Sequence, residues 1–166
     1  MSLRITVITV GIVALFGLLF APRGPLGASV WPEPAHAAEP VGMQLPLFVV
    51  LGLFEAVAMG LGVAFLLFGW RYTKRVFAAT PRLAPPAHVS VAWLLGSWWV
   101  HDNLHMVLGS ENLSTLLALE YGFHVTLMIA GGILAASVYA LARDAGRSRP
   151  EARAGSGDSG LESISD

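Results

Sequence analysis

The chain has 166 residues, of which 55% are hydrophobic and 13% are charged, and its formal net charge is −1. A soluble domain usually carries about 25% charged residues, so this chain has too few polar side chains to cover a surface that faces water. Cysteine is absent, which excludes disulfides and thiolate metal sites. No basic patch interleaved with aromatic residues indicates nucleic-acid binding. The expected partner is the lipid bilayer, and other membrane subunits are left open.

Four apolar stretches predict helices that cross a membrane. A crossing helix needs about 20 apolar residues, within a range of about 17 to 25. The stretches are residues 5–21, 45–70, 89–108 and 113–142. They predict an all-α protein, an integral membrane four-helix bundle with one domain.

The first stretch also resembles a secretory signal peptide. Arg4 precedes it, and the sequence Ala35-His36-Ala37 has the form of an A-x-A cleavage site. Residues 22–34 separate this site from the apolar run, which favours an uncleaved span. If the segment is removed, three helices remain. The domain plan is therefore a span or signal peptide at 1–21, an external Pro/Gly/Ala-rich loop at 22–44, a three-span core at 45–142, and a disordered cytoplasmic tail at 143–166.

The distribution of charge between the stretches predicts the orientation of the chain. The segment between the second and third stretches contains no acid and four basic residues: Arg71, Lys74, Arg75 and Arg82. The segment after the fourth stretch begins with a second basic set: Arg143, Arg147, Arg149 and Arg153. Residues 22–44 and 109–112 lack such an excess. Because cytoplasmic loops are enriched in Lys and Arg, we expect both termini on the cytoplasmic side of the cell membrane if the first span is retained.

Ionisable residues within the predicted spans are the strongest indication of function. Such residues are costly in a bilayer and usually face the interior of the protein or a cavity. The second span contains Glu55. The third and fourth spans contain a denser set: His101, Asp102, Asn103, His105, Glu120 and His124.

The spacing of these residues predicts a metal site. His101 and His105 are four residues apart, as are Glu120 and His124, so each pair shares one face of a helix. The short turn at 109–112 makes the two spans an antiparallel hairpin. Three imidazoles and one carboxylate suit Zn, Cu, Fe or Ni better than Ca or Mg. We therefore expect His101, His105, Glu120 and His124 to be ligands in the outer half of the bilayer, with Glu55 as a fifth ligand or a proton acceptor.

Two neighbouring residues are expected to support the ligands. Asp102 points about 100° away from His101 on a helix of 3.6 residues per turn, so it is predicted to accept a hydrogen bond from an imidazole N–H. Tyr121, next to Glu120, is assigned to the same supporting layer. An alternative places the histidines above the hydrocarbon, in the wet interface, where their cost is smaller.

Three functional hypotheses follow from these residues. The first is a membrane protein with a copper, zinc or iron site that serves metal handling or redox chemistry. The second is a haem b electron-transfer subunit, with His124 and either His101 or His105 as axial ligands. The third is a non-enzymatic proton or ion relay, or a structural subunit with a polar network between helices. The chain contains no nucleotide-binding or hydrolase motif, so catalysis is undecided and no particular family is indicated.

Overall fold

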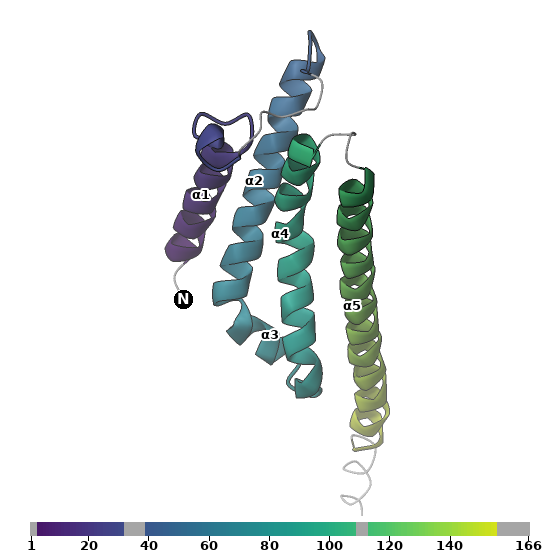
Figure 1. The fold of residues 1–166 in the computed structure, drawn as a ribbon. Helices are drawn as coiled ribbons and strands as arrows, with labels where there is room; N and C mark the ends of the chain where they lie inside the picture. Colours follow the sequence, from purple (N-terminus) through teal and green to yellow (C-terminus); the bar gives the residue numbers. More distant parts are fainter. Residues whose placement is uncertain (1–2, 32–38, 109–112, 156–166) are drawn as a thin grey trace, which may run out of the picture.

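The computed structural model describes residues 3–31, 39–108 and 113–155, with side chains described as far as residue 146. Every regular element in these ranges is a helix, which confirms the all-α prediction (Figure 1). The elements in chain order are α1 (Leu3–Phe20), η1 (Gly27–Ser29), α2 (Gln44–Phe68), α3 (Trp70–Val76), η2 (Pro81–Leu83), α4 (Ala84–Leu108) and α5 (Leu113–Gly155).

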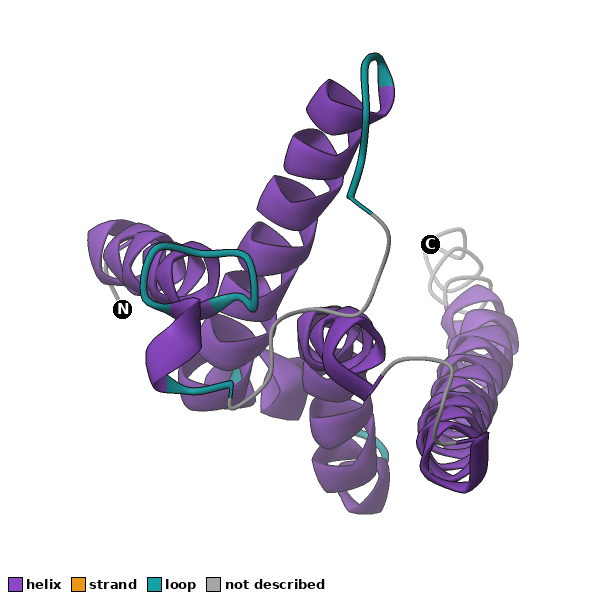
Figure 2. Ribbon diagram, turned by 45° about the horizontal axis from the view of Figure 1, so that its top comes forward, coloured by secondary structure: helices purple, strands orange, loops and turns teal. Residues whose placement is uncertain are grey.

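The four long helices lie side by side in chain order. The main contacts join α1 to α2, α2 to α4, and α4 to α5, and the helices run alternately up and down (Figures 1 and 2). Within the described residues this arrangement is closer to a row than to a closed bundle, so the predicted four-helix bundle is not confirmed. One consequence is that α4 has a long neighbour on each side.

Three described helices are long and apolar enough to cross a membrane: α1, α2 and the part of α5 from Leu113 to Gly146. The third predicted span corresponds to α4. This helix is long enough to cross a membrane, but it is not among the three that are also apolar enough. Its polar side chains lower its hydropathy. Several of them, including Ser90, Ser97 and Asn103, are buried in the protein. The helix therefore tolerates them because its neighbours, rather than lipid, surround them.

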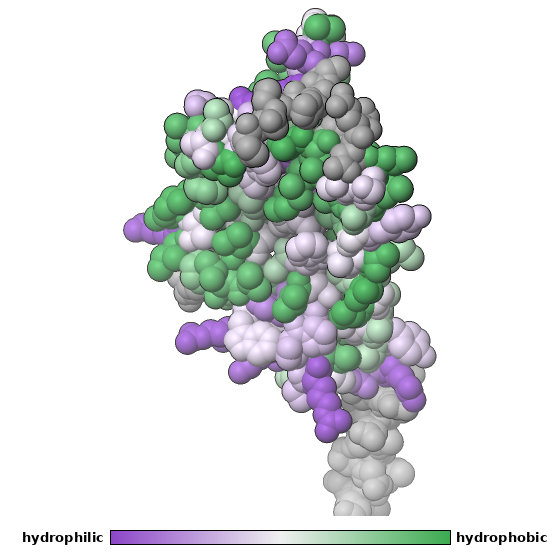
Figure 3. All heavy atoms as spheres, viewed as in Figure 1, coloured by the Kyte–Doolittle hydropathy of each residue, from purple (hydrophilic) through white to green (hydrophobic). Residues whose placement is uncertain are grey.

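Large apolar side chains cover the outside of the molecule. Val7 on α1, Phe54 on α2 and Met128 on α5 are all more than half exposed. Hydrophobic residues occupy the middle of the face shown in Figure 3, and hydrophilic residues collect toward its ends. In water such a surface would be unfavourable, whereas in a bilayer it is the expected one.

Small residues allow the backbones of adjacent helices to approach closely. A Cβ atom on Gly60 of α2 would lie 2.7 Å from the carbonyl oxygen of Val10 on α1, and one on Gly62 would lie 2.7 Å from the backbone nitrogen of Gly96 on α4. The two glycines therefore serve opposite sides of α2. Such close contacts stabilise helix pairs in membranes, where the hydrophobic effect between helices is weak.

The start of the predicted external loop is folded against the end of α1. The indole N–H of Trp31 donates to the carbonyl oxygen of Phe20 at 2.8 Å, and the backbone N–H of Leu26 donates to Leu19. This segment includes η1, although the sequence indicated no regular structure there. Residues 32–38, which hold the A-x-A sequence, and the turn at 109–112 lie outside the described residues.

The opposite end of the molecule is built around α3. Phe77 packs with Ala84 and Ala87, and side chains of α5 close this small core: Leu134 and Leu141. The start of α1, the α2–α4 connection and the end of α5 all lie at this end (Figure 1), which is the alternation that the charge pattern requires. Helix α5 continues to Gly155, beyond the predicted limit of the fourth span at residue 142.

Candidate metal centre

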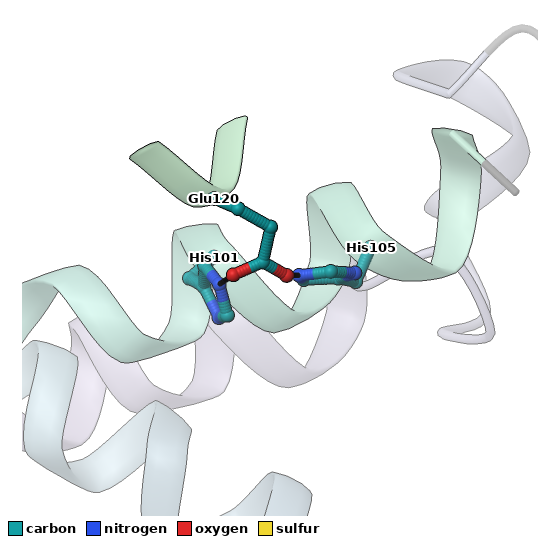
Figure 4. A group of neighbouring side chains, drawn as sticks. All are labelled: His101, His105 and Glu120. Carbon is teal, nitrogen blue, oxygen red and sulfur yellow. Dashed lines mark ion pairs between the residues drawn. The ribbon is translucent and has the colours of Figure 1, made fainter. Parts of the chain in front are cut away.

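His101, His105 and Glu120 meet between α4 and α5. The histidines lie in the last turns of α4, one above the other, and the Glu120 carboxylate reaches between them from α5 (Figure 4). His105 Nε2 is 2.5 Å from Glu120 Oε1, and His101 Nε2 is 3.9 Å from Glu120 Oε2. One nitrogen or oxygen from each residue lies within 4.8 Å of the others. The i,i+4 spacing on α4 and the hairpin geometry together produce this convergence.

These separations are close to those that one metal ion requires. Imidazole nitrogens and carboxylate oxygens bind Zn²⁺ at about 2.0 to 2.2 Å, so neighbouring ligand atoms in a tetrahedral site lie roughly 3.3 Å apart. The distances of 2.5 Å and 3.9 Å fall on either side of this value. Each of the two distances therefore differs from this value by less than about 1 Å.

The His101 ring is held with one nitrogen facing the cluster. Its Nδ1 is 2.8 Å from Asp102 Oδ1, which makes Nδ1–H the donor and leaves the lone pair on Nε2. Nε2 is buried and has no hydrogen-bond partner among the described residues. A buried polar atom without a partner is destabilising unless something else satisfies it. The contact with Asp102 is the one expected from the sequence, and it resembles the carboxylate–imidazole pairs that orient metal ligands.

Aromatic rings cover the inner side of His101. The Phe123 ring on α5 stacks on the imidazole with a centroid distance of 3.9 Å, and Trp98 packs edge-on against Phe123 at 5.2 Å. The His101 side chain is 11% exposed. The sequence pattern did not assign Phe123 to the site. Its position three residues after Glu120, on the same face of α5, could have indicated it.

His124 contacts the cluster from its outer side. Its Nδ1 is 3.0 Å from Glu120 Oε2 and 2.8 Å from the Glu120 carbonyl oxygen. The side chain is 58% exposed, and His124 is not part of the group whose ligand atoms all lie within 4.8 Å. With Nδ1–H directed at the two oxygens, Nε2 is the nitrogen left for a metal.

The remaining two predicted site residues lie elsewhere. Glu55 of α2 forms a side-chain hydrogen bond with Asp102 and does not join the group formed by His101, His105 and Glu120. Tyr121 is 69% exposed, so its ring does not pack into the α4–α5 interface. The depth of Glu55 followed from its position along the second span, but its pairing did not, because the pairing depends on how α2 is rotated toward α4.

Chemically, the cluster offers two imidazole nitrogens and a carboxylate, with a third imidazole adjacent. Neutral imidazoles and one anionic oxygen donor form a set that divalent transition metals prefer. In comparisons with protein-family models, with curated proteins and with solved structures, no match to this chain was found.

Proposed function

We propose that this protein binds one divalent transition-metal ion, namely zinc, copper or iron, between α4 and α5 in the outer half of the cell membrane, and that it holds the ion for transfer. The observation that carries the proposal is the convergence of three groups: the buried His101 Nε2, which has no hydrogen-bond partner within the described residues, His105 Nε2 and the Glu120 carboxylate. A bound cation would satisfy all three groups at once.

The ligand set follows from the available atoms. His101 and His105 bind through Nε2, and Glu120 binds through a carboxylate oxygen. His124, whose Nδ1–H contacts the Glu120 carbonyl oxygen, provides the fourth ligand through Nε2 after a side-chain rotation. Asp102 accepts a hydrogen bond from His101 Nδ1–H and holds the orientation of the ring, as carboxylates behind metal-bound histidines do.

Transfer is favoured over permanent storage because the site is open on one side. Glu120 is 34% exposed and His124 is 58% exposed, whereas His101 is 11% exposed. Closed, fully protein-coordinated sites are typical of structural metals, while an accessible position allows a water or a second ligand to bind. A redox role requires copper or iron, because zinc does not change its oxidation state. Identifying the bound metal as zinc would therefore exclude electron transfer and leave metal transfer.

The haem alternative is less well supported. A porphyrin between α4 and α5 would need the space beside His101 that the Phe123 ring fills at a centroid distance of 3.9 Å. The relay alternative uses the same contacts as the metal site, from Asp102 through His101 and Glu120 to His124. Metal content distinguishes a relay from a metal site, because a relay needs no ion.

The test is elemental analysis of the protein purified without a polyhistidine tag. Wild type is expected to contain about one transition-metal ion per chain, and His101→Ala and His105→Ala are expected to lose most of it. His36→Ala, in the loop segment outside the described residues, removes one histidine as the matched control and should keep the metal. A folded wild type without metal, or equal metal in all four proteins, would contradict the proposal.

A further inference from the structure

The short helix α3 lies where α2 ends and α4 begins (Figure 1). Helix α2 has 25 residues, so at a rise of 1.5 Å per residue it is about 38 Å long. This length exceeds the hydrocarbon core of a bilayer, which is about 30 Å thick. The end of α2 and the whole of α3 therefore reach the level of the lipid head groups, and hydrophilic side chains project at this end of the molecule (Figure 3).

Three cationic side chains share one face of α3. Arg71 and Arg75 are four residues apart and Lys74 is three residues after Arg71, so they are neighbours on the helix surface. All three are exposed. No acidic residue occurs in the sequence between Glu55 and Asp102, and within the described residues none of the three cations forms an ion pair with a carboxylate. Their charge is therefore available to an anion from outside the chain.

The opposite face of α3 is fixed by packing. Thr73 and Phe77 are buried, and Thr73 Oγ1 lies 3.0 Å from Nδ1 of His88 on α4. Trp70 packs against the small core that contains Phe77, and Lys74 Nζ lies 5.2 Å from the centroid of the Trp70 ring. Because these contacts set the rotation of α3 about its axis, the cationic face is directed away from the protein.

An apolar flank lies beside the cationic face. Tyr72 is 68% exposed and Val76 is 39% exposed, and the two are four residues apart on one side of α3. A basic face next to an exposed apolar one is typical of helices that lie in the membrane interface, where tyrosine is enriched. A free anion would contact only the cations, whereas a phospholipid would cover the apolar flank as well.

We propose that α3 binds an anionic phospholipid. Its phosphate contacts Arg71, Lys74 and Arg75, and the upper part of an acyl chain packs against Tyr72 and Val76. Guanidinium groups bind phosphate oxygens through paired hydrogen bonds, and the lysine adds a positive charge. A zwitterionic lipid carries a cation of its own, which would face three others, so the site selects for net negative charge. The proposal goes beyond metal binding and does not depend on it.

The experiment measures the dissociation constant of the first lipid that binds to the full chain, by native mass spectrometry from detergent micelles. The probes are dioleoyl phosphatidylglycerol, which is anionic, dioleoyl phosphatidylcholine, which has the same acyl chains without a net charge, and inorganic phosphate. Wild type is expected to bind phosphatidylglycerol at least about tenfold more tightly than phosphatidylcholine, since each basic residue near the surface attracts an anionic lipid. Inorganic phosphate is expected to bind much more weakly than phosphatidylglycerol.

Two triple variants test the location of binding. Arg71→Gln, Lys74→Gln and Arg75→Gln together are expected to abolish the preference for phosphatidylglycerol, because they remove the cations and leave the apolar flank. Three substitutions near the end of α5 serve as the matched control: Arg147→Gln, Arg149→Gln and Arg153→Gln. They remove the same charge beyond the last described side chain, so this variant should keep the preference of wild type.

Several outcomes would overturn the proposal. The first is equal binding of the two lipids to wild type. The second is a preference for phosphatidylglycerol that survives the α3 substitutions in a protein that remains folded by circular dichroism. The third is an equal loss in both triple variants, which would indicate an effect of net charge alone. The fourth is inorganic phosphate binding as tightly as phosphatidylglycerol, which would indicate a site for a free anion. None of these outcomes depends on metal content, so failure here leaves the metal site to its own test.

Discussion

The side chain of Asp102 contacts both His101 and Glu55, although it does not belong to the cluster of His101, His105 and Glu120. It accepts a hydrogen bond from His101 Nδ1 at 2.8 Å and is bonded to Glu55 on α2. The first contact fixes which nitrogen of His101 faces the cluster. The contact with Glu55 joins α4 to α2. We therefore expect Asp102 to orient a proposed metal ligand, His101, and not to bind the metal itself.

Removal of this carboxylate tests that effect on the ligand. Asp102→Ala is expected to weaken metal binding about 10- to 100-fold while keeping the stoichiometry, because the three ligands remain but the His101 ring is no longer oriented. Competition against a chelator of known affinity measures the change. Tyr121→Phe, at an exposed ring on α5, is the control and should bind like wild type. An unchanged affinity in Asp102→Ala would mean that the ring orientation does not matter.

The sequence was sufficient to find the residues of the cluster but not the groups that surround them. His101 and His105, and Glu120 and His124, each follow from a spacing of four on a helix. The stacking of Phe123 on His101 and the bond between Glu55 and Asp102 depend on the rotation of one helix against another. That rotation is set by packing over the whole interface, which a periodic pattern does not encode.

Among the helices, α2 packs closely against two neighbours, α1 and α4. Gly60 faces α1 and Gly62 faces α4, and both approach backbone atoms of the neighbouring helix. The apolar runs predicted the four long helices to within a few residues at most ends. They did not predict that α4, which is not among the three helices apolar enough to cross a membrane, would lie between α2 and α5 with Ser90, Ser97 and Asn103 buried. Composition alone cannot tell which span is enclosed.

A larger residue at the α1–α2 contact tests how these two helices pack. A Cβ atom on Gly60 would lie 2.7 Å from the Val10 carbonyl oxygen, so Gly60→Leu must displace α1. We expect a loss of stability of about 1 to 3 kcal/mol, the usual effect of overpacking, measured as a lower thermal unfolding midpoint in detergent. Gly11→Leu, at an open position on α1, is the control. Equal midpoints for both variants and wild type would show that α1 does not pack as described.

Across the whole protein, the alternating helices place the cluster of His101, His105 and Glu120 far from the basic end. The α2–α4 connection contains basic residues and lies with the start of α1 and the end of α5, whereas the last turns of α4, which hold His101 and His105, lie at the opposite end (Figure 1). The sequence predicted the alternating direction of the helices, because the basic residues of each connection can be read directly from that segment of the sequence. It did not predict the row of helices in place of a bundle, because apolar faces that point to lipid and apolar faces that point to protein have similar compositions.

Cysteine labelling tests the orientation, which we propose from the charge distribution. The chain has no native cysteine, so single cysteines can be placed at two exposed positions, Val41 before α2 and Ala79 after α3. With a membrane-impermeant maleimide on intact cells, Val41→Cys is expected to react and Ala79→Cys to react only after permeabilisation. The reverse pattern would put the cluster in the cytoplasmic half of the membrane.

Titration of the metal-free protein with Co²⁺, followed by visible absorption, asks whether the cluster holds a single ion. If His101, His105 and Glu120 share one ion, wild type will saturate at one Co²⁺ per chain with the intense bands of a four-coordinate site. His105→Ala and Glu120→Ala will lose those bands, and His36→Ala will keep them. Saturation without such bands, or a spectrum that the two site variants leave unchanged, would contradict a shared metal site between α4 and α5.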